Sequence, residues 1–173
     1  MTRSARLTGA TAERYVPAHR LVAFRPRRSR YCLAVFVINE GQRLLAQLER
    51  TVPYGHDVDI VIADGGSTDG STAEANLLPR GVRALLVKEG PGRLGAQMLM
   101  AFDFALREGY AGVIAMDGNN KDDPEAIPRF LAALDSGCAH VQGSRYMPGG
   151  REANTPFARK WGVRLLHAPL IRL

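Results

Sequence analysis

The sequence has little of what marks disulfide-rich, zinc-binding or membrane-spanning proteins. Its 173 residues include two cysteines, Cys32 and Cys138, with no C-x-x-C pair and no zinc-ligand spacing. Both lie in or beside apolar runs, so we expect two buried thiols in a reducing compartment. No stretch approaches the about 18 apolar residues of a membrane-spanning helix. The N-terminal region also lacks the apolar core of a signal peptide. We therefore expect a cytoplasmic protein with at most peripheral contact at the cytoplasmic face of a membrane.

The basic character of the chain is confined to one end. The net charge of +6 is typical of a nucleic-acid-binding protein, but residues 1–30 hold eight arginines against a single acid, Glu13. The other 143 residues carry 15 basic and 16 acidic side chains, so the body of the protein is close to neutral. We therefore expect no nucleic-acid partner and interpret residues 1–30 as a basic, disordered extension. Contact with anionic lipid, worth about 1 kcal/mol per basic residue, and an organellar address are the alternatives.

After residue 30, apolar runs typical of strands alternate with helical patterns. Strands are expected at 31–38, 58–63, 82–87, 112–116 and 139–143, and helices at 40–51, 71–78, 95–108, 124–135 and 156–167. This alternation predicts one α/β domain over residues 31–173, with a mostly parallel sheet and helices on both faces. The amphipathic segment 161–173 stops abruptly after Pro169, so we expect the domain to be incomplete at its C-terminus.

Two glycine-rich segments are similar to nucleotide-binding motifs. The segment 65–71 lacks the Lys that a P-loop needs, and Asp69 would face the phosphates, which excludes a P-loop. The segment 90–95 reads G-P-G-R-L-G, matches G-x-G-x-x-G, and lies between an expected strand and an expected helix. Glu89 would place a carboxylate beside a pyrophosphate, so we favour a structural turn. An NAD-dependent oxidoreductase remains an alternative.

Polar loops follow three of the expected strands. Asp64, Asp117 and Arg145 lie in these loops, and the carboxyl ends of parallel strands form one edge where ligands bind. Asp117 and Asn119 form a D-x-N pair whose hard oxygen atoms suit Mg²⁺ or Mn²⁺ shared with a diphosphate. The alternative for this pair is a turn with Asx hydrogen bonds.

The remaining polar groups extend this interpretation. The Asp64 carboxylate can accept hydrogen bonds from a base or a ribose hydroxyl, and the Arg145 guanidinium suits a phosphate unless it pairs with a neighbouring acid. Asn39 and Glu40 follow the first expected strand, where they either contact the same ligand or cap the next helix. Together these groups predict a site for a phosphate- and hydroxyl-bearing ligand.

With these residues placed, the chain resembles family 2 glycosyltransferases of the GT-A fold. The resemblance is greatest to the branch that contains dolichyl-phosphate mannosyltransferases and polyprenyl-phosphate glycosyltransferases. It is carried by segments 39–40, 63–71, 116–125 and 143–150, and it covers about residues 31–168. The last of these segments, G-S-R-Y-M-P-G-G, is the one most specific to that branch.

The resemblance implies a Rossmann-like GT-A domain that transfers a sugar, with inversion, from GDP-mannose or UDP-glucose to a polyprenyl or dolichyl phosphate. The residues it implies for the nucleotide-sugar donor are Asn39, Glu40, Asp64, Gly65, Arg93, Asp117, Gly118 and Asn119. It places Arg145 and Arg159 at the acceptor phosphate, assigns catalysis to Asp117 and Arg145, and assigns Mg²⁺ or Mn²⁺ to Asp117 and Asn119. An already anionic acceptor phosphate needs little general-base help.

Three positions depart from the family pattern. The family's D-D-G-S is Asp64-Gly65-Gly66-Ser67 here, and its D-x-D is Asp117-Gly118-Asn119, so each motif loses one carboxylate. A further position that is usually Gln is Lys121, which cannot coordinate a metal but can contact phosphate. These changes leave a second hypothesis open, in which the chain is a non-catalytic nucleotide-binding fragment.

Overall fold

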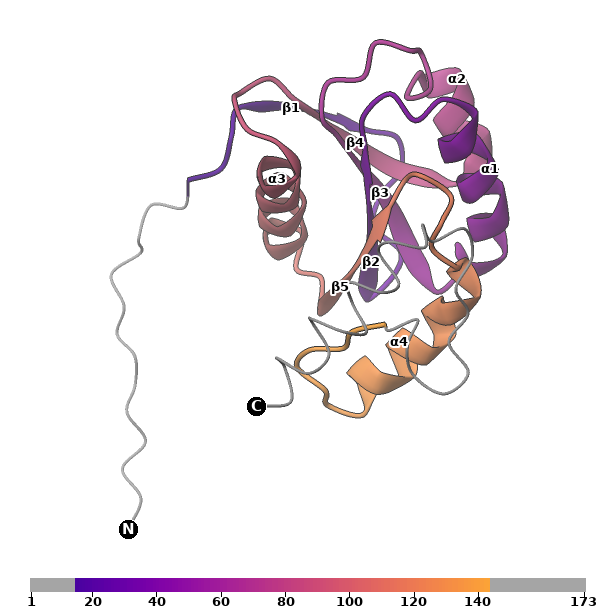
Figure 1. The fold of residues 1–173 in the computed structure, drawn as a ribbon. Helices are drawn as coiled ribbons and strands as arrows, with labels where there is room; N and C mark the ends of the chain where they lie inside the picture. The colour runs from indigo at the N-terminus through magenta and orange to yellow at the C-terminus, as the bar shows by residue number, and fades with distance from the viewer. Residues whose placement is uncertain (1–14, 144–173) are drawn as a thin grey trace, which may run out of the picture. The chain divides into compact units, whose positions relative to one another are not determined.

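The computed structural model describes residues 15–143 (Figure 1). The strands are β1 (His19–Ala23), β2 (Tyr31–Val37), β3 (Val58–Asp64), β4 (Val82–Lys88) and β5 (Gly112–Asp117). The helices are α1 (Gln42–Thr51), α2 (Glu74–Leu77), α3 (Leu94–Arg107) and α4 (Ile127–Asp135), with 3₁₀ turns η1 (Val52–Tyr54), η2 (Leu78–Arg80) and η3 (Pro124–Ala126). The described residues up to Gly137 belong to one compact unit, and those from Cys138 to Gly143 belong to another. All the elements listed belong to the first unit.

The strands form one sheet in the order β1-β4-β3-β2-β5. The pairs β2–β3, β3–β4 and β2–β5 are parallel, and only the outer strand β1 is antiparallel, to β4. The chain moves outward from β2 through β3 to β4 and then returns to place β5 on the opposite side of β2. Such a reversal of strand order opens a crevice at the carboxyl ends of the strands. The expected mostly parallel α/β sheet is confirmed.

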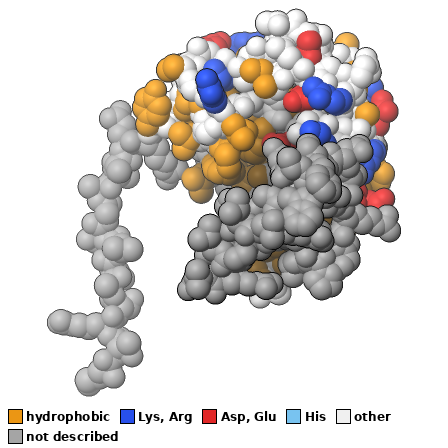
Figure 2. All heavy atoms as spheres, viewed as in Figure 1, with side chains coloured by type: hydrophobic (Ala, Val, Ile, Leu, Met, Phe, Trp, Pro, Cys, Tyr) orange, Lys and Arg blue, Asp and Glu red, His pale blue; other side chains and the backbone are white. Residues whose placement is uncertain are grey.

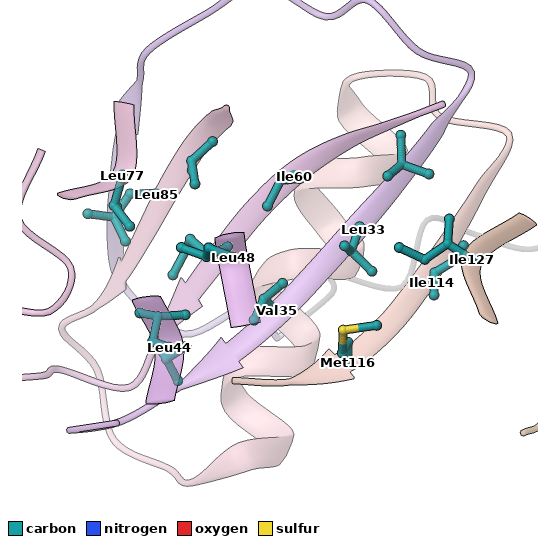
Figure 3. Packing of buried hydrophobic residues seen from close by; sticks show 14 of the residues in the cluster. Leu33, Val35, Leu44, Leu48, Ile60, Leu77, Leu85, Ile114, Met116 and Ile127 are labelled. Carbon is teal, nitrogen blue, oxygen red and sulfur yellow. The ribbon is translucent and has the colours of Figure 1, made fainter. Parts of the chain in front are cut away.

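Two apolar layers cover the sheet, because successive side chains of a strand point to opposite faces. On one face, Leu33, Val35 and Ile60 pack with Leu44 and Leu48 of α1, as Figure 3 shows. Ile127 of α4 and Leu77 of α2 belong to the same layer. On the other face, Ala34, Val61 and Ala63 pack with Met100 and Phe104 of α3. Helices therefore lie on both faces, as the sequence predicts.

The basic segment before β2 is part of the fold. The prediction that residues 1–30 are disordered is wrong for residues 15–30, because β1 pairs with β4 and adds an edge to the sheet. Arg25 donates from Nη2 to the Leu78 carbonyl (2.7 Å), and Arg27 donates from Nη1 to the Glu108 carbonyl (2.8 Å). These arginines therefore satisfy backbone carbonyls at the ends of helical segments. Residues 1–14 lie outside the described part of the chain.

Two further predictions need correction. Residues 139–143 form no strand, and most of them are exposed. Only one of the five, Val141, is a β-branched residue, so the segment has little of the composition that favours a strand. Cys138 is exposed, whereas Cys32 is buried as expected. The helix expected at 156–167 lies outside the described residues.

A buried polar network closes the amino ends of β2 and β3. The Asp59 Oδ2 atom accepts hydrogen bonds from the Tyr110 hydroxyl (2.7 Å) and from the backbone N–H groups of Arg28 (3.0 Å) and Ser29 (3.2 Å). Arg83 donates to the Tyr110 hydroxyl at 2.7 Å. Burial, together with the bond to Asp59, raises the pKa of Tyr110. This network anchors the segment between β1 and β2 at the end of the sheet opposite the crevice.

Helix α3 presents an apolar outer surface. Figure 2 shows hydrophobic side chains gathered on the side of the molecule where α3 lies, and Leu94, Leu99 and Leu106 of this helix are exposed. Between residues 15 and 143, no helix combines the length and the apolar character needed to cross a membrane.

Candidate functional site

A cavity of about 440 Å³ opens at the carboxyl ends of the central strands. Its walls include the last residues of β2, Gly65 after β3, Lys88 at the end of β4, the start of α3, and the segment from Asp117 to Asn119 after β5. This is the crevice that the reversed strand order creates. The sequence-predicted residues that line the cavity are Glu40, Gly65, Arg93, Asp117, Gly118 and Asn119.

Asp117 presents an available carboxylate to the cavity. Among the described residues, no donor hydrogen-bonds this carboxylate, and the backbone N–H of Asp117 donates to Asp122 Oδ2 at 3.1 Å. The pKa of Asp117 is raised, first because neighbouring atoms displace water and second because Asp122 carries the same charge, while Lys121 acts in the opposite direction. A bound cation would stabilise the charged form of a carboxylate that is partly desolvated and lies near another acid.

The two residues after Asp117 have different local roles. Gly118 is closely packed, because a Cβ atom there would collide with the Val37 side chain and lie 3.1 Å from the Phe36 carbonyl oxygen. Only glycine allows the chain to pass so close to β2. Asn119 lines the cavity, and its Oδ1 accepts from the Lys121 N–H at 3.1 Å. The predicted Asx turn is therefore present, and the amide oxygen retains a second lone pair.

Gln47 fixes the turn that carries these residues. Its Nε2 donates to the Asp117 carbonyl (2.7 Å), and its Oε1 accepts from the Asn120 N–H (2.6 Å). The side chain is fully buried on α1. Sequence reasoning missed Gln47, although a signal was present: Gln47 stands one position before Leu48 and three after Leu44, on the apolar face of an amphipathic helix. A lone buried amide on such a face must find partners.

Asp64 is not among the residues that line the cavity. Its carboxylate is buried, and Oδ1 accepts from the Gly66 N–H (3.0 Å), the Ser67 N–H (2.8 Å) and the Ser67 hydroxyl (2.7 Å). Oδ2 accepts from the Thr72 hydroxyl at 3.0 Å. These four bonds organise the loop after β3. The described contacts give Asp64 a structural role, and the predicted contact with a nucleoside stays a prediction.

The loop after β2 is bonded to the loop after β3. Asn39 has a left-handed backbone (φ 51°), and its Oδ1 accepts from the Thr68 N–H at 2.8 Å. The Gly41 N–H donates to Asp69 Oδ2 at 2.8 Å. Gly41 is the N-cap of α1 and has no side-chain cap, so neither Asn39 nor Glu40 caps the helix. Asn39 therefore joins the two loops and is not among the cavity-lining residues.

Glu40 lines the cavity itself. Its Oε2 pairs with Arg43 Nη2 at 2.9 Å, and the side chain is only 18% exposed. The acid is therefore compensated by a cation on the first turn of α1 and adds little net negative charge to the cavity.

Two cationic residues, Arg93 and Lys88, line the same cavity as Asp117. Arg93 lies at the N-cap of α3 and is exposed, and its side chain has no hydrogen-bond or ion-pair partner among residues 15–143. Lys88 ends β4, and its Nζ donates to the Gly90 carbonyl at 2.8 Å. Sequence reasoning did not place Lys88 in the site, although a lysine between a buried strand and a glycine-rich turn indicates a candidate phosphate-binding residue. Both cations suit the phosphates of a ligand.

The glycine-rich turn before α3 has a structural role. The N–H groups of Glu89 and Gly90 both donate to the Ala18 carbonyl at 2.8 Å, just before β1. These amides are therefore engaged, whereas a dinucleotide fingerprint needs this turn to approach a pyrophosphate closely. Gly92 has φ +109°, and a Cβ there would lie 2.7 Å from the Ala96 Cβ. The geometry agrees with a structural turn.

Some predicted residues cannot be placed. Arg145 and Arg159 lie outside the described residues. Over residues 15–143, no group of three or more His, Cys, Asp or Glu side chains is arranged to hold a metal ion. An ion at Asp117 and Asn119 would therefore need further ligands, such as the oxygens of a bound diphosphate.

Comparison with known proteins identifies the family. The profile of Glycosyl transferase family 2 matches residues 32–171, which is most of the chain. The chain belongs to glycosyl transferase family 2. The predicted resemblance is therefore confirmed, and the oxidoreductase alternative has no support.

Three relatives of known name are similar to this family 2 chain. It is 40% identical over 125 residues to the polyprenol monophosphomannose synthase of Mycolicibacterium smegmatis, which covers 70% of this chain and 47% of the relative. It is 32% identical over 121 residues to the undecaprenyl-phosphate mannosyltransferase of Micrococcus luteus, covering 67% and 47%. It is 28% identical over 120 residues to the dolichol-phosphate mannosyltransferase of Pyrococcus furiosus, covering 69% and 33%. The match thus spans half or less of each relative's length.

Proposed function

We propose that this family 2 domain transfers a sugar from a nucleotide-sugar donor to the phosphate of a polyprenol or dolichol, with inversion at the anomeric carbon. GDP-mannose and UDP-glucose are the candidate donors. The names of the three relatives favour mannose as the sugar and a polyprenyl-type phosphate as the acceptor.

The observation that carries the proposal is the available Asp117 carboxylate on the cavity wall. It stands with Asn119 after β5, while Arg93 and Lys88 contribute positive charge from the far side of β2. A nucleoside diphosphate needs cationic groups at its phosphates and a means of neutralising the charge that develops when it departs. The cavity combines these two requirements at one end of the sheet.

The proposed reaction needs little proton transfer. An oxygen of the acceptor phosphate forms a bond to the sugar C1 atom while the bond from C1 to the diphosphate oxygen breaks. The electron pair of that bond leaves with the nucleoside diphosphate. The acceptor is already an anion, so the domain contributes mainly by positioning the two substrates and by neutralising the leaving group.

The residues after β5 fit a hard divalent cation in part. Asp117 has no described donor on its carboxylate, and Asn119 places an amide oxygen on the same cavity. We propose that these two residues hold Mg²⁺ or Mn²⁺ together with the donor's diphosphate. The ion would supply positive charge to the departing diphosphate. The positive charge of Lys121 acts to lower the pKa of Asp117. Lys121 therefore adds positive charge beside the diphosphate without coordinating the ion.

The acceptor side of the proposal depends on residues beyond 143. Arg145 and Arg159 are proposed to contact the acceptor phosphate. A lipid-linked acceptor would also bring the domain to the cytoplasmic face of a membrane as a peripheral protein.

Titration calorimetry tests the donor half of the proposal. GDP-mannose and UDP-glucose are titrated with and without Mn²⁺ into wild type, Asp117→Ala and Glu49→Gln. Glu49 is a matched control, because it is an exposed acid that pairs with Arg80 away from the cavity. We expect one donor to bind, Asp117→Ala to weaken binding by about tenfold or more (about 1.4 kcal/mol), and Glu49→Gln to bind as wild type. Equal binding by Asp117→Ala, or no binding by wild type, would overturn the proposal.

A transfer assay distinguishes the proposed transferase from the second hypothesis, a non-catalytic nucleotide-binding domain. Wild type and Arg145→Ala are incubated with the bound donor and a short-chain polyprenyl phosphate in detergent. Formation of glycosylated lipid by wild type, and its loss in Arg145→Ala with donor affinity unchanged, supports the transferase. Donor binding without any product from wild type would favour the non-catalytic alternative.

A further inference from the structure

We propose that Gln97 is a specificity-determining residue of the donor site and that its side-chain oxygen accepts a hydrogen bond from the nucleoside. We further propose that Gly65 must remain glycine for Gln97 to take this position. The inference rests on the proposed function, because it assumes that the cavity binds a nucleotide sugar. The inference names Gln97 as the residue that discriminates between nucleosides. The sequence motifs do not indicate this role.

The orientation of the Gln97 amide is fixed by two carbonyl groups. Its Nε2 donates to the Val37 carbonyl at 2.6 Å and to the Ala63 carbonyl at 2.9 Å, so both amide hydrogens are used. The opposite orientation would place the amide oxygen against two acceptors, which excludes it. The side chain therefore bridges the ends of β2 and β3, and its nitrogen faces the sheet.

The oxygen is the part of Gln97 that remains for a ligand. The residue is 5% exposed and lines the cavity. No donor within residues 15–143 hydrogen-bonds Oε1, and this oxygen is not among the described side-chain atoms that are buried without a partner, so a molecule in the cavity can reach it. A polar side chain this buried, with its donors engaged and its acceptor unused, is complementary to an N–H or O–H group of a molecule in the cavity.

The Gln97 amide has space beside residue 65 because glycine has no side chain. A Cβ atom at position 65 would lie 3.1 Å from Gln97 Nε2 and 3.3 Å from its Cδ, and 3.4 Å from the Ile38 Cβ. The Gly65 N–H donates to the same Val37 carbonyl at 2.8 Å. A longer side chain at 65 would therefore compete with the Gln97 amide for one volume on the cavity wall.

Glycine at position 65, with the Gln97 amide beside it, changes which polar group a bound nucleoside meets. The family pattern D-D-G-S would place a carboxylate at position 65, whereas this chain presents the neutral amide oxygen of Gln97. A neutral acceptor pairs with the imide N–H of uracil, the ring N–H and amino group of guanine, or a ribose hydroxyl. It repels a base that presents only acceptors at this point. A buried polar group left unpaired by the wrong ligand is an effective source of discrimination.

The test compares nucleosides and separates recognition from folding. UDP, GDP, ADP and CDP, together with inorganic pyrophosphate as a probe without a nucleoside, are titrated into wild type and Gln97→Met. We expect Gln97→Met to weaken the preferred nucleoside diphosphate by about five- to tenfold and to reduce the preference among the four bases. Pyrophosphate affinity should change by less than about twofold. Loss of affinity for pyrophosphate and for all four nucleotides by the same factor would show a merely structural role and overturn the inference.

A second set of variants covers the case in which Gln97→Met does not fold. Gly65→Asp should weaken nucleotide binding, because its Cβ atom would lie in tight contact with the Gln97 amide and displace it. The double variant Gly65→Asp/Gln97→Ala should recover binding to within about threefold of wild type and should show a changed base preference. Additive losses in the double variant would overturn the inference. Absence of nucleotide binding by wild type would overturn the proposed function and this inference together, and so is distinguishable from failure of the inference alone.

Discussion

Gln47 and Asp117 are joined between α1 and the end of β5, where the Gln47 Nε2 donates to the Asp117 carbonyl at 2.7 Å. The same side chain accepts from the Asn120 N–H at 2.6 Å. A buried amide on one helix thus holds both sides of the turn that presents the Asp117 carboxylate. The position of the carboxylate proposed to hold the metal ion therefore depends on Gln47, which does not line the cavity.

Replacing Gln47 should therefore affect both stability and donor binding. Gln47→Leu leaves the Asp117 carbonyl and the Asn120 N–H without their partner, which we expect to lower the free energy of unfolding by about 2–4 kcal/mol. Urea denaturation measures the loss, and calorimetry should show weaker donor binding. Gln42→Leu on the same helix is the control, because Gln42 is exposed. A Gln47→Leu protein as stable as the control would contradict the role assigned to the amide.

Asp117 should reduce stability at neutral pH. Because its folded-state pKa is raised, the folded protein binds the proton more tightly than the unfolded chain does. Stability from this group therefore falls as pH rises from the ordinary Asp pKa to the raised value, and the penalty stays constant above it. Asp117→Asn should raise Tm at neutral pH and lose that advantage in acid, while it weakens donor binding. The effect should be small, because the residue is exposed. A lower Tm for Asp117→Asn at neutral pH would disprove this assignment.

Tyr110 should matter for folding and not for donor binding. Tyr110→Phe removes the hydroxyl between Asp59 and Arg83 and leaves a buried acid and a buried cation with one partner fewer. We expect the free energy of unfolding to fall by about 1–3 kcal/mol. Donor affinity should be unchanged, since the network lies at the amino ends of the strands. Tyr54→Phe, at a half-buried tyrosine that packs beside the core, is the control. A donor affinity that falls with Tyr110→Phe would show that the two ends of the sheet are coupled.

The two thiols should differ in reactivity. Burial raises the pKa of Cys32 to about 12, so the reactive thiolate is almost absent at neutral pH. Cys138 is exposed. A disulfide reagent such as Ellman's should therefore titrate one thiol in the folded protein and the second only after denaturation. Cys138→Ser should remove the fast reaction. Rapid modification of both thiols in the folded protein would contradict the burial of Cys32.

The sequence predicts the central elements of the fold because their physical signals are local. The bounds predicted for β2, β3, β4 and β5 agree with the structure to within one residue at each end. Pro124 marks the helical turn before α4. Strand β1 was missed because it has only five residues and is held at the sheet edge by backbone hydrogen bonds to β4, which the sequence does not reveal.

The site was harder to predict than the fold, because the motifs contain acidic residues but do not show which groups hydrogen-bond to them. Asp117 and Asp64 look equivalent in sequence, yet Asp64 accepts four hydrogen bonds from its own loop and Asp117 accepts none from described residues. The role of Gln97 depends on the space left by Gly65, which lies 32 positions away in the chain. Such a relationship becomes visible only when β3 and α3 are packed together.

A structure of the wild-type protein with its bound nucleotide sugar tests the central claim most directly. Our account predicts that the diphosphate lies in the cavity beside Asp117 and Arg93, with the nucleoside against Gly65 and the Gln97 oxygen. A nucleotide sugar bound at another surface, with this cavity containing only solvent, would contradict it.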